Sequence, residues 1–265
     1  MGYKGEITSR QNQLINTYTK LKNKKSRDEM GLFFFEGKKL FVEAIENKAN
    51  VKCVFVLESL KQFCEEYFKK YDFDYYVVNE SVYQKLTNES SPEGIFTICQ
   101  MTELKEKSDG IILILDSLQD PGNIGTIIRS ADAFGCKRII CSNGCADIYS
   151  DKTIRASMGA IFRVSIKRER DIIKDITELK EAGYIVYASV LQKESEKLGN
   201  IKNFENTAFV IGNEGNGIRE NVISACSKKV YIPMVQNSSE SLNASVAASV
   251  ILYKASENKL LEKKK

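Results

Sequence analysis

The chain has 265 residues, of which 43% are hydrophobic and 28% are charged, and its formal net charge is +4. This composition is typical of a folded protein long enough for two domains, and it excludes a largely disordered chain. The sequence contains no histidine, which excludes Ser-His-Asp triads, Cys-His proteases, His-ligated zinc hydrolases and imidazole proton shuttles.

No apolar run approaches the roughly 18 to 20 residues that a membrane helix needs, and the N-terminus starts no apolar signal segment. We therefore expect a cytoplasmic protein with no membrane partner. The seven cysteines are odd in number and scattered, which indicates reduced thiols. No metal site is expected, because the spacing of Cys136, Cys141 and Cys145 fits no common zinc pattern.

Basic residues gather at the N-terminus, where residues 1–40 hold nine Lys or Arg against four Asp or Glu. Such an excess favours a polyanionic partner, and a solvated helix face is the alternative. The segment 8–25 is polar and basic, and it predicts an exposed helix capped by Thr8 or Ser9. Segments with the apolar pattern of a strand then alternate with segments that have the pattern of a helix, which indicates a small α/β sandwich. The predicted strands are 32–35, 51–57, 75–78 and 94–99, and the predicted helices are 38–47, 60–70 and 81–86.

Residues 101–110 are polar and end in a turn signal, so they predict a linker. An apolar run at 111–115 follows, which is typical of a central parallel strand covered on both faces. Further strands are predicted at 138–141, 184–189, 208–212 and 230–232, with helices between them. The sequence thus predicts two α/β domains, residues 1–105 and a doubly wound parallel domain of residues 106–265.

Three motifs in the second domain carry candidate chemistry, and the first spans residues 115–131. A strand ends, Asp120-Pro121-Gly122 turns the chain, and a helix opens toward the ligand-binding edge of the sheet. Asn123 and Arg129 lie about 1.7 turns apart, near the same helix face. The arginine provides a fixed cation for a phosphate or a developing alkoxide. An ordinary helix start with a surface arginine is the alternative.

The second motif, residues 209–218, is a strand that runs into glycines with Glu214 among them. These glycines allow a ligand to approach the backbone closely. A nicotinamide-dependent oxidoreductase is the alternative. However, the glycine spacing is not G-x-G-x-x-G, and no second strand that ends in Asp or Glu follows about 20 residues later.

The third motif is a short strand at 230–232, a polar loop, and a helix of small residues from Leu242 to Tyr253. Small side chains predict close packing of this helix against another element. Taken alone, Ser241 is also a candidate helix cap.

Together the three motifs resemble those of the SpoU (TrmH-like) family of RNA ribose 2′-O-methyltransferases in the SPOUT superfamily. The resemblance rests on Asn123, Arg129, Gly212, Glu214, Ser241 and Asn243. Residues 155–160 resemble the family's middle segment, and residues 7–12 and 35–37 resemble its N-terminal substrate-binding domain, so the resemblance covers nearly the whole chain.

The resemblance implies an α/β fold with a small N-terminal substrate-binding domain and a C-terminal parallel-sheet domain closed by a trefoil knot, a rare exception to unknotted topology. It also implies S-adenosylmethionine as cofactor and a homodimer in which the partner subunit completes each active site. The implied catalytic residues are Arg129, Asn123, Glu214, Ser241 and Asn243. The implied cofactor-binding residues are Ser189, Val190, Leu191, Ile211, Gly212, Asn213, Gly215, Ile232, Met234, Ser241 and Leu242. The candidate RNA-binding residues are Arg10, Lys22, Lys24, Lys25, Arg27, Lys38 and Arg155.

The expected activity is therefore 2′-O-methylation of a ribose in structured RNA, with 23S ribosomal RNA as the expected substrate. A transfer RNA 2′-O-methyltransferase is one alternative, and a non-catalytic RNA-binding or ribosome-assembly protein of the same fold is another. The residues select neither the nucleotide nor its base.

Overall fold

The computed structural model describes residues 2–89, 91–101, 110–136, 138–169, 171–235 and 241–262. Its contacts divide the chain into two compact units, residues 1–102 with 149–162 and residues 103–148 with 163–265. Residues 149–162 thus group with the first unit, although they follow the predicted boundary between residues 105 and 106. The predicted linker at 101–110 falls almost entirely outside the described residues.

The first unit is built on a mixed five-stranded sheet with the strand order β1-β4-β3-β5-β2. Strands β1, β4 and β3 are parallel, whereas β5 is antiparallel to both of its neighbours. The bounds of the strands are β1 Tyr3–Ile7, β2 Leu32–Glu36, β3 Val51–Leu57, β4 Asp74–Val78 and β5 Ile95–Gln100.

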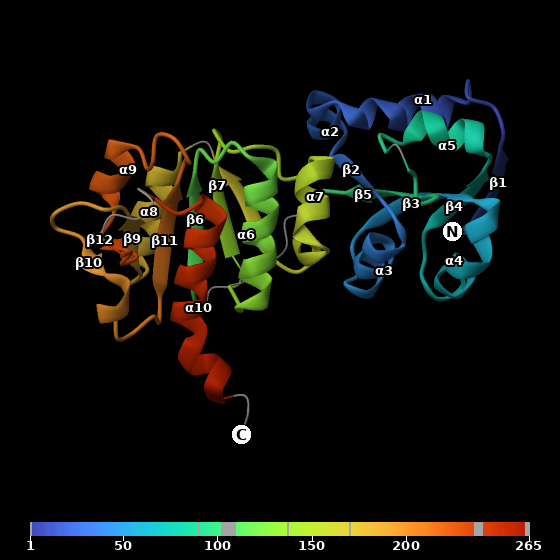
Figure 1. Ribbon diagram of the computed structural model, residues 1–265. Helices are drawn as coiled ribbons and strands as arrows, with labels where there is room; N and C mark the ends of the chain where they lie inside the picture. Colours follow the sequence, from blue (N-terminus) through green and yellow to red (C-terminus); the bar gives the residue numbers. More distant parts are fainter. Residues whose placement is uncertain are drawn as a thin grey trace. The chain divides into compact units, whose positions relative to one another are not determined.

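Helices cover both faces of this sheet, as Figure 1 shows. Apolar residues of α1 and α5 pack on one face against Phe34 and Phe55, and those of α3 and α4 pack on the other against Val54 and Val56. This arrangement confirms the predicted α/β sandwich. The helix bounds are α1 Gln13–Thr19, α2 Lys24–Met30, α3 Lys38–Glu46, α4 Glu58–Lys70, α5 Glu80–Leu86 and, later in the chain, α7 Asp151–Ser157.

The prediction of a single exposed helix over residues 8–25 is wrong. Helix α1 begins after Asn12, and α2 begins after Asn23. Each asparagine side chain accepts a hydrogen bond from the backbone N–H two residues later, which caps the helix that follows. The extended backbone of Asn23 (φ −93°, ψ 131°) breaks the helix. The segment also buries Ile15 and Leu21, so it has an apolar face as well as a basic one.

The second unit contains a seven-stranded sheet with the strand order β10-β12-β9-β11-β6-β7-β8, and every pair of neighbours is parallel. This confirms the predicted parallel-sheet domain. The trefoil knot stays a prediction. The strand bounds are β6 Ile112–Asp116, β7 Arg138–Ser142, β8 Ser165–Glu169, β9 Ile185–Ser189, β10 Glu196–Lys197, β11 Thr207–Gly212 and β12 Lys228–Tyr231.

Helices cover both faces of this sheet (Figure 1). Helices α8 and α9 pack on the side chains of alternate strand residues such as Ile114, Val186 and Val210. Helices α6 and α10 lie side by side on the other face. The helix bounds are α6 Pro121–Ala133, α8 Ile172–Glu181, α9 Glu220–Ala225 and α10 Ala244–Glu262. None of the helices in the described ranges is long and apolar enough to cross a membrane.

Strands β1, β8 and β10 are not among the sequence predictions. All three are edge strands. An edge strand needs no continuous apolar run, and β8, with the sequence SIKRE, has a mostly polar composition. The Lys167 side chain of β8 instead forms a 2.9 Å ion pair with Asp175 of α8.

Candidate active site

The first two motifs meet at the carboxyl ends of adjacent parallel strands. Strands β6 and β11 are paired so that Asp116 lies opposite Gly212, the last residue of each strand. Segments that leave neighbouring parallel strands emerge at the same edge of the sheet, where open α/β sheets bind their ligands. This register brings the residues after Asp116 next to those after Gly212.

Helix α6 positions the first motif at this edge. Its cap is Asp120, whose side chain accepts a 2.9 Å hydrogen bond from the backbone N–H of Asn123. Pro121 starts the helix, where a missing N–H is harmless. Ile124, Ile127 and Ile128 are fully buried and anchor the helix. The predicted turn and helix start are thereby confirmed.

The second motif forms a tight hairpin, the 213–217 loop. The backbones of Asn213 and Gly217 exchange two hydrogen bonds, of 2.9 and 3.0 Å. The Asn213 side-chain oxygen also accepts from the N–H groups of Gly215 and Asn216. A Cβ on Gly212 would lie 2.4 Å from the backbone carbonyl carbon of Gly217. Only glycine fits at 212, because the two arms of the loop pass so closely there.

Side chains from all three motifs form one hydrogen-bonded chain. The Nδ2 of Asn123 donates a 2.7 Å hydrogen bond to Oε1 of Glu214. The Nδ2 of Asn243 donates a 3.1 Å hydrogen bond to Oδ1 of Asn123. The amide nitrogen and the amide oxygen of the Asn123 side chain thus both form hydrogen bonds, and the two other motifs set the orientation of this side chain.

Asn243, and not Ser241, is the cap of α10. Its side-chain oxygen accepts from the backbone N–H of Ser245 at 2.9 Å, while its amide nitrogen reaches Asn123. The predicted helix start at Leu242 is thus two residues early, and the cap role considered for Ser241 is wrong. The predicted close packing of the small-residue helix is observed. Ser249 of α10 and Ser130 of α6 share a 2.8 Å hydrogen bond, and Ala248 is fully buried.

Arg129 does not join this chain of side chains. It lies on the exposed part of α6, and its guanidinium forms no hydrogen bond or ion pair within the described residues. The structure therefore brings together Asn123, Glu214 and Asn243 among the five predicted catalytic residues. Arg129 remains an exposed cation one residue before the α6–α10 contact at Ser130.

A cavity of about 150 Å³ lies at the carboxyl ends of β9 and β12. The loop before α10 also lines it, and Asn243 directly follows the lining residue Leu242. The residues that line the cavity are Ser189, Val190, Leu191, Tyr231, Ile232, Met234, Ser241, Leu242 and Ala247.

The lining residues fit S-adenosylmethionine in chemical type. Aliphatic side chains such as Val190, Ile232 and Leu242 suit an apolar adenine ring. The hydroxyls of Ser189 and Ser241 can hydrogen-bond the polar groups of the cofactor. Seven of the eleven predicted cofactor residues line the cavity, whereas Ile211, Gly212, Asn213 and Gly215 do not. Tyr231 and Ala247 line it without having been predicted, although both lie within the third motif.

A low-pKa thiol lies at the same edge of the sheet. The Sγ of Cys145 donates to the carbonyl oxygen of Leu115 at 3.3 Å. A hydrogen bond with Cys141 lowers the pKa of Cys145, and the same interaction raises that of the buried Cys141. Within the described ranges, no group of three or more His, Cys, Asp or Glu side chains is arranged to hold a metal ion.

Two of the predicted RNA-binding residues are engaged inside the first unit. Arg27 is buried, and its Nη1 donates to the carbonyl oxygens of Leu21 and Lys22. The Nζ of Lys22 donates to the carbonyl oxygen of Thr87 at 2.6 Å. The hydrogen bonds of Arg27 stabilise the turn between α1 and α2. Because the side chain is buried, direct contact of Arg27 with RNA is not expected.

The other predicted RNA-binding residues are exposed, as Lys22 also is. Arg10 is exposed, and Lys24 and Lys25 form surface ion pairs with acidic residues four positions later. The Nζ of Lys38 lies 5.3 Å from the centre of the Phe63 ring. Arg155 forms ion pairs with Glu89 and Asp151. Surface pairs of this kind contribute little stability, so these cations can exchange partners at low cost.

Comparison with known proteins gives a family match for each of the two predicted domains. Residues 110–253 match the SpoU rRNA Methylase family, and residues 12–97 match the MRM3-like substrate binding domain. A Bacillus subtilis protein named 23S rRNA (guanosine(2553)-2'-O)-methyltransferase RlmP is 32% identical over 94% of this chain and 98% of its own length.

Solved structures agree with this assignment. An AdoMet-bound rRNA methyltransferase from Sinorhizobium meliloti is 26% identical, covers 97% of this chain and 98% of its own, and superimposes with a TM-score of 0.84. A structure described as an RNA 2'-O ribose methyltransferase is 28% identical, covers 96% of this chain and 99% of its own, and has a TM-score of 0.77. With these matches and the three motifs joined at one sheet edge, the chain belongs to the SpoU rRNA methylase family.

Proposed function

We propose that this protein methylates a ribose 2′-hydroxyl in 23S ribosomal RNA, with S-adenosylmethionine as the methyl donor. The observation that carries the proposal is the Asn123–Glu214–Asn243 hydrogen-bonded chain next to the cavity lined by Ser241 and Leu242. The similarity to the Bacillus subtilis 23S rRNA methyltransferase over nearly its whole length supports the choice of RNA. We further propose that the target is the guanosine equivalent to the one in that protein's name.

The bound cofactor supplies a methyl group on a positively charged sulfur. The protein then has to align the ribose oxygen with that methyl group, and alignment of this kind contributes about 7 to 11 kcal/mol in well-oriented intramolecular reactions. We propose that Asn123, Glu214 and Asn243 fix the loops around the reacting atoms. Ser241 lines the cavity and is proposed to hold the cofactor or the ribose.

Arg129 is proposed to stabilise negative charge on the forming alkoxide or on a neighbouring phosphate. Its guanidinium is a permanent cation and donates hydrogen bonds without accepting any. It is exposed and has no intramolecular partner within the described residues, so its charge is available to RNA. A preorganised donor for a developing oxyanion contributes about 2.7 to 4 kcal/mol to catalysis.

A homodimer is proposed on the basis of the α6–α10 surface. Val246, Val250 and Tyr253 of α10 are exposed, and with Thr126 of α6 they line an apolar groove. Exposed apolar patches of this kind mark association surfaces. Because Arg129 lies on α6 near this surface, a second copy docked there would bring another active site close to it. A cytoplasmic location is proposed together with this function.

The activity is tested with the purified full-length chain, radiolabelled S-adenosylmethionine, and 23S ribosomal RNA and transfer RNA that lack the modification. The RNA is digested to nucleosides and analysed by mass spectrometry. We expect label in 2′-O-methylguanosine from 23S ribosomal RNA. Label in transfer RNA alone would favour the transfer RNA alternative, and RNA binding without label or cofactor binding would favour a non-catalytic protein.

A further inference from the structure

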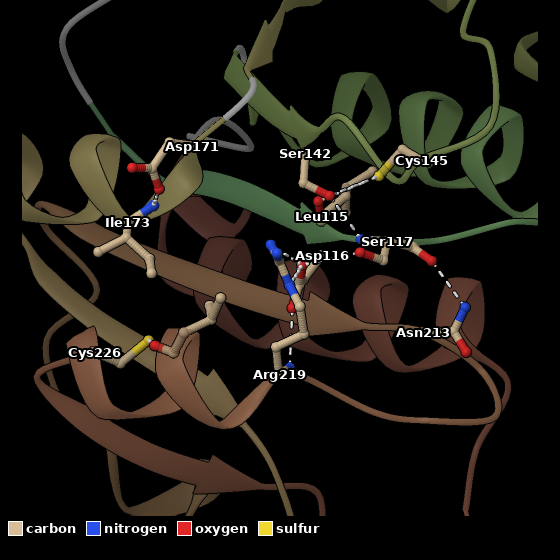
Figure 2. Close-up of polar contacts among 11 residues, drawn as sticks. Leu115, Asp116, Ser117, Ser142, Cys145, Asp171, Ile173, Asn213, Arg219 and Cys226 are labelled. Atoms are coloured by element: carbon tan, nitrogen blue, oxygen red, sulfur yellow. Dashed lines mark hydrogen bonds and ion pairs between the residues drawn. The ribbon is translucent and has the colours of Figure 1, made fainter.

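The 213–217 loop, which presents Glu214, is anchored to the end of β6 at two points. On its N-terminal side, Nδ2 of Asn213 donates a 2.8 Å hydrogen bond to the carbonyl oxygen of Ser117. On its C-terminal side, Arg219 contacts the carboxylate of Asp116. Figure 2 shows Arg219 and Asn213 converging on Asp116 and Ser117 from the two ends of the loop.

The Arg219–Asp116 contact is unusually complete. The backbone N–H of Arg219 donates to Oδ2 at 3.0 Å and its Nε donates to Oδ1 at 2.8 Å, while Nη2 lies 2.7 Å from Oδ1 in an ion pair. The carboxylate of Asp116 is 0% exposed. Two hydrogen bonds and an ion pair from one residue thus satisfy a charge that has no access to water, and a buried carboxylate left without its cation is strongly unfavourable.

Ser117 is itself held in place between two strands. It has a positive φ of 59°, a conformation that L residues rarely adopt. Its backbone N–H donates to Oγ of Ser142 at the end of β7 at 2.9 Å, while its carbonyl accepts from Asn213. The anchor of the loop is therefore a fixed point at the edge of the sheet rather than a mobile chain.

The tip of the loop is held within the loop by hydrogen bonds to the Asn213 side chain. Glu214, Gly215, Asn216 and Gly217 are exposed, and the contact of Glu214 with Asn123 is the tip's link to α6. The position of the Glu214 carboxylate thus depends on how firmly both ends of the loop are held. Displacement of about 1 Å in an active site can reduce a rate on the order of 100-fold.

We propose that Arg219 and Asp116 are positioning residues for the methyl transfer, and that their ion pair holds the 213–217 loop so that Glu214 meets Asn123. This role rests on the proposed function. Neither residue needs to touch RNA or cofactor, and neither is among the lining residues of the cavity. The ion pair therefore acts through the loop alone.

The test compares the full-length wild-type protein with Arg219→Gln, Arg219→Lys and Asp116→Asn in a methyl-transfer assay on 23S ribosomal RNA. Asp175→Asn is the matched control, because Asp175 is also a buried carboxylate with an ion pair in the same unit, to Lys167 at 2.9 Å. Arg219→Gln is the decisive variant, since the Arg219 side chain is half exposed and glutamine keeps an N–H donor near the Asp116 carboxylate, which the backbone N–H of residue 219 still contacts.

We expect Arg219→Gln to lower kcat about 10- to 100-fold while the dissociation constant for S-adenosylmethionine, from calorimetry, stays unchanged. Arg219→Lys should restore part of the loss, because it keeps the charge but not the forked contact. Asp175→Asn should lower the thermal midpoint and leave kcat unchanged. In a double-mutant cycle, Arg219→Gln should add little to the effect of Glu214→Ala.

Wild-type kcat in Arg219→Gln, or full additivity with Glu214→Ala, would overturn the positioning role and leave the proposed function intact. Should Asp116→Asn fail to fold, the result for Arg219→Gln still decides. A wild-type protein that binds cofactor and RNA but transfers no methyl group would overturn the proposed function, and the positioning role with it.

Discussion

Asn123 and Glu214, which are 91 positions apart in sequence, are joined by a 2.7 Å hydrogen bond from Nδ2 to Oε1. Asn243 extends this link by donating to the same Asn123 side chain. Each of the three residues comes from a different motif, and they follow β6, β11 and β12, three different strands of the parallel sheet. The contact therefore reports whether the carboxyl edge of the sheet is correctly assembled.

Glu214→Ala should reduce kcat about tenfold or more, because a hydrogen bond to a charged group contributes about 1.5 to 3 kcal/mol. Glu214→Gln retains an acceptor for Asn123 and should lose less. The measurement is single-turnover methyl transfer at saturating cofactor and RNA. Glu220→Ala, which removes an exposed carboxylate at the start of α9, serves as the control. Equal activity of Glu214→Ala and Glu220→Ala would contradict the role of the Asn123 contact.

Arg129→Ala should bind S-adenosylmethionine normally and lose methyl transfer by a factor on the order of 100 or more. The thermal midpoint should stay unchanged, because Arg129 is exposed and has no hydrogen bond within the described ranges. Lys174→Ala, which removes an exposed cation on α8, is the matched control. Normal turnover by Arg129→Ala would remove this arginine from the mechanism.

Gly212→Ala should destabilise the second unit by about 1 to 3 kcal/mol, because the added Cβ overlaps backbone atoms that cannot move independently. We also expect loss of methyl transfer, since the clash pushes apart the arms of the 213–217 loop. Gly199→Ala is the control, because a Cβ there meets no atom within 4 Å. Urea unfolding measures both variants, and similar stabilities for the two would contradict the close approach at Gly212.

Cys145 should react with iodoacetamide at lower pH than Cys226 and the other thiols whose pKa is raised. A thiolate is the nucleophile, so alkylation speeds up as the pH rises through the pKa, and the lowered pKa of Cys145 moves that rise toward neutral pH. Burial raises the pKa of Cys226 to about 12, so Cys226 should stay unreactive near neutrality. Cys141→Ala removes the hydrogen-bond partner and should shift the Cys145 profile to higher pH. Mass spectrometry of the labelled peptides measures this, and an unshifted profile would refute the role of Cys141.

Val250→Asp should convert a dimer into a monomer. Val250 and Tyr253 are 36% and 51% exposed on α10, and a charge within the apolar groove would have to be buried on association. Sedimentation velocity measures the change, with Phe63→Asp as the control, because Phe63 is exposed to a similar extent on α4 of the first unit. A wild-type protein that sediments as a monomer would rule out the proposed homodimer.

The sequence predicts the ends of the central strands well because their apolar runs stop at polar or glycine residues. Asp116 and Gly212 each end a buried strand, and motif residues follow both. The order of the strands, however, is a tertiary property, so the pairing of β11 with β6 could not be derived from spacing. The sequence therefore predicts Asn123 and Glu214 as candidate site residues, whereas their direct contact could not be predicted.

Some contacts could not be predicted because the two partners lie far apart in sequence. Lys22 has the character of a surface cation, but its Nζ contacts the carbonyl of Thr87, 65 positions later. Arg219 stands in the sequence as an ordinary basic residue after the glycine-rich motif, and only the structure shows the buried Asp116 opposite it. Local patterns describe which side chains are available, whereas the tertiary fold decides which of them meet.

The central claim is tested most directly by mapping 2′-O-methyl groups in 23S ribosomal RNA from cells that lack this protein and from cells that carry it again. The account predicts that one 2′-O-methylated guanosine disappears on deletion, returns with the wild-type chain, and does not return with Arg129→Ala. An unchanged map of ribosomal RNA methylation after deletion would contradict the account.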